Sequence, residues 1–216
     1  MKKTIALILI LASILLVGCK EEPEERNLPP LKELQSVEIK EYEGEKLDSL
    51  VDVKDLSIKG PQTIAIDTYQ LELTGLVETP KALTYEEVLA RQRYSKVITL
   101  YCVTGWDSTN LWEGILLEDL FNEVKVKPEA NTVIFHAKDG YTTSLPLDFI
   151  LENDIMLAYK INNVTLPPET GYPFMLAAEQ KLGYKWIKWV TKIELSDNPG
   201  YRGYWESRGY SNEAEI

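Results

Sequence analysis

Alternation of apolar and polar residues predicts strands in the first half of the chain, and helical spacing predicts two short helices. Residues 37–42 and 69–74 alternate as half-buried strands do. The segment Thr84-Tyr-Glu-Glu has the spacing of a capping box, which predicts a helix over residues 84–92. Apolar residues recur at helical spacing over residues 116–124. Between these helices an apolar run over residues 96–102 predicts a further strand that ends in a turn.

The second half of the chain is typical of hairpins. Residues 131–145 alternate around a tight turn at Asp139-Gly140, and residues 155–166 do so around Asn162-Asn163. A proline-rich loop follows over residues 167–173. Interleaved hairpins and short helices predict an α+β fold with mixed sheets and a single domain.

A final strand is predicted near residues 184–195, and its parity separates two lysines. Lys185 falls on the apolar face beside Gly183, where it would point into a cleft. Lys188 falls on the other face and is most simply a solvated residue, although a kink after Gly183 would upset this parity. The apolar face carries Ile187, Trp189, Ile193 and Leu195.

The N-terminal residues predict export and a membrane anchor. A basic start and a short apolar stretch predict a signal peptide over residues 1–18. Leu16-Val-Gly-Cys resembles the lipobox of bacterial lipoproteins, which implies that Cys19 is lipidated; the alternative is an ordinary N-terminal anchor without lipid. Residues 19–34 are charged and proline-rich and predict a flexible tether to a domain over residues 35–216. The protein is therefore expected outside the cytoplasm, attached to the cell membrane by its lipid.

The charge of the chain argues against nucleic acid as a partner. The sequence has 23 basic and 34 acidic residues, a net charge of −11. Without the two lysines of the signal, 21 basic residues remain against 34 acidic ones, a net charge of −13. Phosphate backbones are bound by clustered Lys and Arg, so no nucleic acid is expected.

Cys102 is the strongest candidate for chemistry. It is the sole cysteine beyond Cys19 and shares a strand face with Ile98 and Leu100. Buried cysteines are most often small hydrophobic residues, so a core role and a reactive role both stand open. The one histidine, His136, leaves zinc sites of several His or Cys and serine triads short of partners. A Cys–His hydrolase is conceivable, but His136 would have to be the base for Cys102.

Seven segments, in order over about residues 57–216, resemble the molybdopterin-binding domain of the sulfite oxidase family, including its bacterial protein-methionine-sulfoxide reductase branch. The segments are Tyr101-Cys-Val-Thr-Gly-Trp106, Leu111-Trp-Glu-Gly-Ile115, Asp139-Gly-Tyr141, Leu157-Ala-Tyr159, Gly171-Tyr-Pro173, Gly183-Tyr-Lys-Trp-Ile-Lys-Trp189 and Trp205-Glu-Ser-Arg-Gly-Tyr210. The resemblance implies a molybdopterin-dependent oxidoreductase that carries out two-electron oxygen-atom transfer.

The resemblance also implies a role for each matching position. Cys102 stands in the place of the cysteine that ligates molybdenum, a role that suits a soft thiolate. Tyr210 matches a tyrosine beside the metal's oxo group, where a phenol can assist proton transfer; the alternative is a surface tyrosine near the C-terminus. His136 either faces the pterin or packs in the sheet. The other cofactor candidates are Trp106, Asp139 and Tyr141 in loops that resemble site walls, although such aromatic residues are equally normal in a core, and Gly183, Tyr184, Lys185 and Lys188 in a segment that resembles the pterin-phosphate loop.

Three departures from the family pattern bear on function. Met175 stands where sulfite-oxidising relatives carry an arginine for the anion, which favours a neutral, sulfoxide-like substrate, small or protein-bound, over sulfite. Haem and dimerisation domains of some relatives have no counterpart before Ile216, so a separate electron-transfer partner is expected. The N-terminus lacks the twin arginines typical of exported molybdopterin proteins. The alternative hypothesis is therefore a surface lipoprotein that keeps the fold, lacks the cofactor and binds another ligand.

Overall fold

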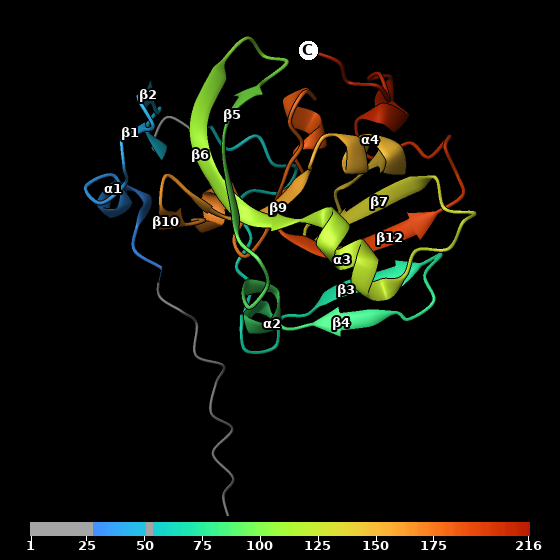
Figure 1. The fold of residues 1–216 in the computed structure, drawn as a ribbon. Coiled ribbons are helices and arrows are strands. Elements are labelled where there is room, and N and C mark those ends of the chain that lie inside the picture. Colours follow the sequence, from blue (N-terminus) through green and yellow to red (C-terminus); the bar gives the residue numbers. More distant parts are fainter. Residues whose placement is uncertain (1–27, 51–53) are drawn as a thin grey trace, which may run out of the picture.

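Two five-stranded sheets form the body of the protein in the computed structural model, which describes residues 28–50 and 54–216 (Figure 1). The first sheet has the order β10-β9-β6-β5, with β11 also paired to β9, and the second has the order β4-β3-β12-β7-β8. Strand β12 runs parallel to β3, and the other pairs in both sheets are antiparallel. Strands β1 and β2 make a separate small hairpin.

The strands are β1 Glu41–Tyr42, β2 Glu45–Lys46, β3 Leu71–Gly75, β4 Lys81–Leu83, β5 Tyr94–Tyr101, β6 Asp107–Leu116, β7 Thr132–Ala137, β8 Thr142–Pro146, β9 Met156–Ile161, β10 Val164–Thr165, β11 Met175–Ala177 and β12 Val190–Ser196. The helices are α1 Leu31–Leu34, α2 Tyr85–Leu89, α3 Leu117–Val124 and α4 Leu147–Glu152, with short 3-10 turns η2 Pro168–Thr170, η3 Gly183–Lys185 and η4 Glu206–Arg208.

The predicted helices and hairpins are confirmed, with small changes at their ends. Thr84 caps α2 through a capping box, and the helix ends at Leu89, earlier than predicted. The turn between β9 and β10 is made by Asn162 and Asn163, whose φ angles of 47° and 65° suit the left-handed backbone of a two-residue hairpin. Helix α3 begins at Leu117, and its apolar side chains are buried as the spacing predicts.

The N-terminal predictions need correction where the structure describes them. The expected strand over residues 37–42 reduces to Glu41–Tyr42. The tether predicted to reach residue 34 instead includes α1, and Leu34 at its end is 7% exposed and joins the core. Apolar burial thus outweighs the charged, proline-rich composition at this point. The predicted signal peptide and Cys19 lie outside the described residues.

The predicted strand over residues 184–195 is wrong in its first half. The chain forms η3 there, and β12 begins only at Val190. Trp189 has a positive φ of 52°, so the strict alternation of side chains stops before β12. Trp186, which alternation would place on the same face as Lys188, is 4% exposed and packs on Trp112 of β6 with ring centroids 5.4 Å apart.

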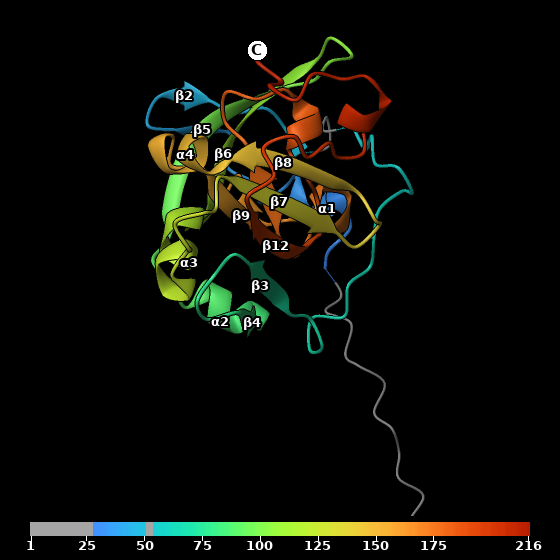
Figure 2. The same cartoon turned by 90° about the vertical axis from the view of Figure 1, so that its right-hand side faces the viewer.

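The C-terminal segment returns from β12 to lie beside η3 (Figure 2). The Leu182 amide donates to the Ala214 carbonyl at 2.8 Å, and Lys181 and Glu215 form an isolated antiparallel bridge. The core draws apolar side chains from both sheets and from α2 and α3. Within residues 28–50 and 54–216, the length and hydropathy needed to cross a bilayer are not found in any helix.

Candidate functional site

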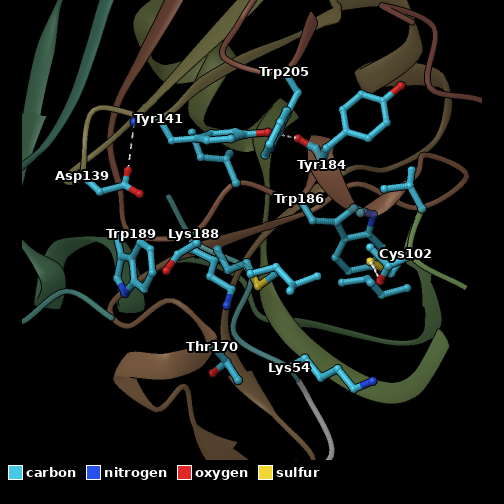
Figure 3. Close-up of a pocket in the computed structure, with 18 of the residues that line it drawn as sticks. Lys54, Cys102, Asp139, Tyr141, Thr170, Tyr184, Trp186, Lys188, Trp189 and Trp205 are labelled. Atoms are coloured by element: carbon cyan, nitrogen blue, oxygen red, sulfur yellow. Dashed lines mark hydrogen bonds between the residues drawn. The ribbon is translucent and has the colours of Figure 1, made fainter. Parts of the chain in front are cut away.

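A cavity of about 310 Å³ lies where six segments distant in the sequence meet, and we call it the Cys102 pocket (Figure 3). Its size suits a small organic cofactor or ligand. Its lining residues are Lys54, Leu56, Ser57, Leu100, Cys102, Val103, Thr104, Trp106, Asp139, Tyr141, Thr170, Met175, Gly183, Tyr184, Trp186, Ile187, Lys188, Trp189, Trp205 and Tyr210.

Cys102 directly follows strand β5 and lines the pocket. It continues the strand face of Ile98 and Leu100, as the alternation along the sequence predicts. The buried side chains of Ile98 and Leu100 fix the strand, and Cys102 follows directly as a partly buried free thiol. A tight turn holds it: the Cys102 amide donates to the Trp106 carbonyl at 2.9 Å. The Cys102 sulfur lies 3.2 Å from the Thr104 hydroxyl. The thiol is therefore held on a rigid strand end and faces the pocket.

Gly183 brings a second segment against this turn. A Cβ atom at Gly183 would lie 3.3 Å from the Tyr101 carbonyl oxygen and 3.6 Å from the Cys102 Cα. The close approach of the two backbones favours glycine. Gly183 lines the pocket as predicted, and it also supports Cys102.

The indole of Trp106 carries a hydrogen-bond donor that nothing in the described part of the chain uses. Its indole Nε1 is buried and has no partner there. A buried N–H without a partner costs about 1–3 kcal/mol. Trp106 lies in the pocket wall. An acceptor on a bound molecule would satisfy this donor.

The β7–β8 turn supplies Asp139 and Tyr141 to another wall. Asp139 is 3% exposed, and its Oδ1 accepts from the Tyr141 amide at 2.9 Å. The Tyr141 hydroxyl donates to the Tyr184 carbonyl at 2.5 Å, which ties this turn to η3 (Figure 3). Burial, helped by the Glu206 carboxylate, raises the pKa of Tyr141 well above its usual value. Tyr141 is thus a fixed neutral phenol.

Tyr210 reaches the pocket from the C-terminal segment. Its ring lies 5.2 Å, between centroids, from those of both Tyr184 and Trp205. The Tyr210 side chain is 37% exposed, so it stands at the pocket mouth. The structure therefore brings Tyr210 into the same cavity as Cys102, where the family resemblance implies it.

Neither lysine has the environment that the parity of the predicted strand gives it. Lys185 is fully buried and does not line the pocket; its Nζ binds Glu206 Oε1 at 2.6 Å and the Ser144 carbonyl at 2.9 Å. Burial lowers the pKa of Lys185, and Glu206 opposes this effect. Lys188, predicted to be solvated, lines the pocket. The break before β12 turns these side chains relative to the predicted strand.

His136 lies away from the pocket. It stands on β7 beside β12, and its Nε2 lies 2.9 Å from Glu194 Oε2. Burial, and then the nearby Lys192, lowers the pKa of His136 against the opposing effect of Glu194. Of its two predicted roles, the structure supports packing in the sheet.

The sequence reasoning overlooked the segment over residues 54–57 and the side chain of Thr170. Lys54, Leu56 and Ser57 line the pocket, and Asp55, which lies between Lys54 and Leu56, pairs with Lys188 Nζ at 3.1 Å. This pair joins positions 133 residues apart, and no local pattern marks it. The spacing of Asp55 and Ser57, typical of an Asx turn, was the available signal.

The pocket fits a cofactor that carries its own metal. In the described ranges no three His, Cys, Asp or Glu side chains lie close enough to hold a metal ion. A metal at Cys102 would therefore take most of its ligands from an organic group. Cys102 lines the cavity that such a group would occupy, and Trp106, whose buried Nε1 has no partner in the described part of the chain, lies in its wall.

The chain belongs to the molybdopterin-binding oxidoreductases: residues 58–205 match the family described as "Oxidoreductase molybdopterin binding domain". This match confirms the predicted family, the enzyme class and molybdopterin as cofactor. The predicted fold class is also confirmed. The crystal structure of the sulfane dehydrogenase SoxCD from Paracoccus pantotrophus has a TM-score of 0.60 at 22% identity, over 88% of this chain and 58% of that one.

Among sequence relatives, the "Uncharacterized oxidoreductase YuiH" of Bacillus subtilis is 38% identical over 66% of this chain and 72% of its own length. The "Putative protein-methionine-sulfoxide reductase subunit YedZ1" of Azospira oryzae is 32% identical over 67% of this chain and 55% of its own length. The "Protein-methionine-sulfoxide reductase catalytic subunit MsrP" of Gluconobacter oxydans is 30% identical, and the chain spans 47% of it. The chain thus matches about half the length of the two relatives named for sulfoxide reduction.

Proposed function

We propose that this protein reduces a neutral sulfoxide to a sulfide, using bound molybdopterin and electrons from a separate partner. The balanced reaction takes a sulfoxide, two electrons and two protons to a sulfide and water. The observation that carries the proposal is the position of Cys102, a free thiol held at a strand end and facing the pocket. When bound, the cofactor supplies the two-electron redox chemistry.

The pocket residues have separate tasks in this proposal. Cys102 is the ligand to the metal, since a thiolate suits a soft centre. Trp106 Nε1 donates to an acceptor on the bound cofactor. Tyr141, held as a neutral phenol, orients η3 and excludes water. Tyr210 stands at the mouth, where its phenol can pass a proton between solvent and the substrate oxygen.

The walls of the pocket favour a substrate without charge. Met175 lines the pocket and is 3% exposed, at the position where an arginine would serve an anion. Leu56 and Val103 are 53% and 46% exposed at the rim, which suits an apolar group next to the sulfoxide. The names of the two matched reductases point to methionine sulfoxide in a protein as the candidate substrate.

The partner and the location form part of the same proposal. Two relatives are named as subunits, which supports a separate electron-transfer partner for this chain. The signal over residues 1–18 and the lipobox at Cys19 support export and lipid anchoring to the cell membrane. The cofactor would then be loaded either before export, with the folded protein exported without a twin-arginine signal, or after export.

The test compares Cys102→Ser with the wild-type protein, both purified from the native host. We expect the wild type to contain molybdenum and pterin and to reduce dimethyl sulfoxide with a chemical electron donor. We expect Cys102→Ser to lose a thiolate-to-metal absorption band and at least about 100-fold in kcat, because a hydroxyl is a poorer ligand for a soft metal. Thr104→Ser, which keeps the adjacent hydroxyl, serves as the matched control. Wild-type protein without molybdenum or pterin would contradict the proposal and favour the cofactor-free alternative.

A further inference from the structure

Residues 54–64, which we call the strap, supply part of the wall of the Cys102 pocket through Lys54, Leu56 and Ser57. Between described residues, a single ion pair joins the strap to the rest of the molecule: Lys188 Nζ donates to Asp55 Oδ1 at 3.1 Å. The other hydrogen bonds of the strap lie within it, and none of its backbone groups bonds to another described segment.

Apolar packing holds the pocket end of the strap weakly. Leu56 is 53% exposed although it lines the pocket. The residue of the strap that packs against the core is Ile64, at its far end. A segment with few buried apolar contacts and no backbone hydrogen bonds opens at a low cost in free energy. The pair of Asp55 and Lys188 therefore decides whether the pocket end of the strap is closed.

Asp55 is held by the strap itself. The Ser57 amide donates to Asp55 Oδ1 at 3.1 Å, and the Ser57 hydroxyl donates to Oδ2 at 2.9 Å. Burial opposes ionisation of Asp55, but Lys188 and Ser57 outweigh it and keep the pKa of Asp55 below its usual value. Because both bonds from Ser57 lie within the strap, Asp55 and the strap move together when Asp55 leaves Lys188.

Lys188 is also the pocket lysine that fits the cofactor. Its side chain is 14% exposed, and Figure 3 shows it between Trp189 and Cys102. Its Nζ also donates to the Glu169 carbonyl at 2.6 Å, so two of its three N–H donors are in use. Molybdopterin carries a phosphate, and a partly buried ammonium suits an anionic oxygen. A carboxylate and a second anion on one ammonium repel each other, so the two compete for Lys188.

We propose that Asp55 is a latch residue for cofactor loading: it closes the strap on Lys188, and the strap opens when Lys188 exchanges this carboxylate for an anionic oxygen of the cofactor. Lys188 binds the cofactor, and Asp55 is a positioning residue that acts through it. Asp55 lies outside residues 58–205, so the latch residue is not part of the matched family domain. The inference concerns loading and goes beyond the proposed function, since it holds for any substrate.

The first experiment follows the release of pterin from full-length, loaded protein by the fluorescence of the released and oxidised pterin. We expect Asp55→Asn to release pterin about tenfold more slowly than the wild type, because a neutral amide competes less well than a carboxylate for Lys188. Asp55→Glu keeps the carboxylate and should release pterin as the wild type does. Asp67→Asn removes the same charge from an exposed turn outside the pocket wall and should also match the wild type.

The second experiment measures how fast trypsin cleaves the strap after the exposed Lys59, with the cut bond identified by mass spectrometry. Proteases cut segments that can leave the body of a protein, so an open strap is cleaved faster. In cofactor-free protein, made in a host without molybdopterin, Asp55→Asn and Lys188→Met should each raise the rate severalfold. The double variant should add nothing further, because both changes open the same latch. Loading should raise the rate in the wild type and leave it unchanged in Asp55→Asn.

An ion pair that only stabilised the pocket wall would give the reverse results. Asp55→Asn would then lose pterin faster, and loading would protect the strap of the wild type from trypsin. Release from Asp55→Asn that is unchanged or faster, or cleavage of wild-type protein that does not rise on loading, would overturn the inference. The wild-type comparison needs no variant, so it decides the question even if a substitution prevents folding. Neither readout uses turnover, so loaded protein that fails to reduce dimethyl sulfoxide removes the proposed function and leaves this test intact.

Discussion

At the scale of single residues, the unused hydrogen-bond donor of Trp106 should affect the stability of the protein differently with and without the bound cofactor. Its buried Nε1 lowers the stability of the cofactor-free protein for lack of an acceptor. The same N–H becomes favourable once an acceptor enters the Cys102 pocket. One substitution should therefore have different effects in the two forms.

We expect Trp106→Phe to change the free energy of unfolding of the cofactor-free protein by less than about 1 kcal/mol, because removal of the unpaired donor offsets lost packing. In loaded protein the same change should cost about 1–2 kcal/mol more. Thermal unfolding of both forms measures this difference. Trp112→Phe is the control, since Trp112 Nε1 already donates to the Ile98 carbonyl at 3.3 Å and should cost the same in both forms. Equal costs for Trp106→Phe would show that the cofactor does not use this donor.

Residue types could be assigned to the site from the sequence more readily than side-chain directions. The positions of Cys102, Asp139 and Tyr141 follow from a strand end and a hairpin turn, which local patterns predict. The direction of Lys185 depends on the turn η3, and the strand alternation that would have placed Lys188 is broken by η3 and by a positive φ at Trp189. That conformation is set by tertiary contacts, among them the hydrogen bond from Trp189 Nε1 to the Pro168 carbonyl at 2.8 Å.

At the scale of elements, Glu123 joins α3 to two neighbours. It accepts from Lys81 of β4 at 2.9 Å and from Arg91, just beyond α2, at 2.6 Å. The hydrogen bond from Arg91 is the main cause that lowers the pKa of Glu123 to about 2. The elements were predictable from amphipathic spacing, whereas this link between them was not, because it joins positions 32 and 42 residues apart.

We expect Glu123→Gln to cost about 1–2 kcal/mol of stability at neutral pH, a value reduced for the partial exposure of the pair. A carboxyl with a depressed pKa stabilises the fold above its unfolded value of about 4.3, and the contribution is lost as the pH falls towards 2. Urea unfolding from pH 7 to pH 3 should show the cost of the substitution shrinking as the pH falls. The exposed Glu129→Gln should show a small, nearly constant effect; a pH-independent cost for Glu123→Gln would contradict the ion-pair explanation.

At the scale of the whole molecule, a buried ion pair attaches the C-terminal segment to the sheets. Glu206 is fully buried and binds Lys185 Nζ and the Thr143 hydroxyl, each at 2.6 Å. Arg202 donates to the carbonyls of Glu206 and Tyr210, which closes the segment on itself. This attachment holds Trp205 and Tyr210 at the pocket.

We expect Lys185→Met and Glu206→Gln each to cost about 3–5 kcal/mol, because each leaves a buried polar partner unsatisfied. The double variant should cost less than the two single costs together, which a double-mutant cycle in urea measures. The exposed pair of Lys125 and Glu78, 3.7 Å apart, is the matched control, and Lys125→Met should cost less than about 1 kcal/mol. Strictly additive costs at Lys185 and Glu206 would contradict the coupling.

The assembly of the site was only partly accessible from the sequence. The ordered motifs predicted the family and most of the pocket walls, because each motif is a local segment. The contribution of residues 54–57 and the burial of Lys185 depend on contacts between distant segments, which a single sequence does not reveal.

The placement of the tryptophans gives the protein a built-in optical reporter. Four of the five tryptophans in the chain line the Cys102 pocket, and the fifth, Trp112, packs on one of them. Nearly all of the intrinsic fluorescence therefore arises at or beside this cavity. The emission spectrum should follow occupancy of the pocket directly, without a label and without turnover.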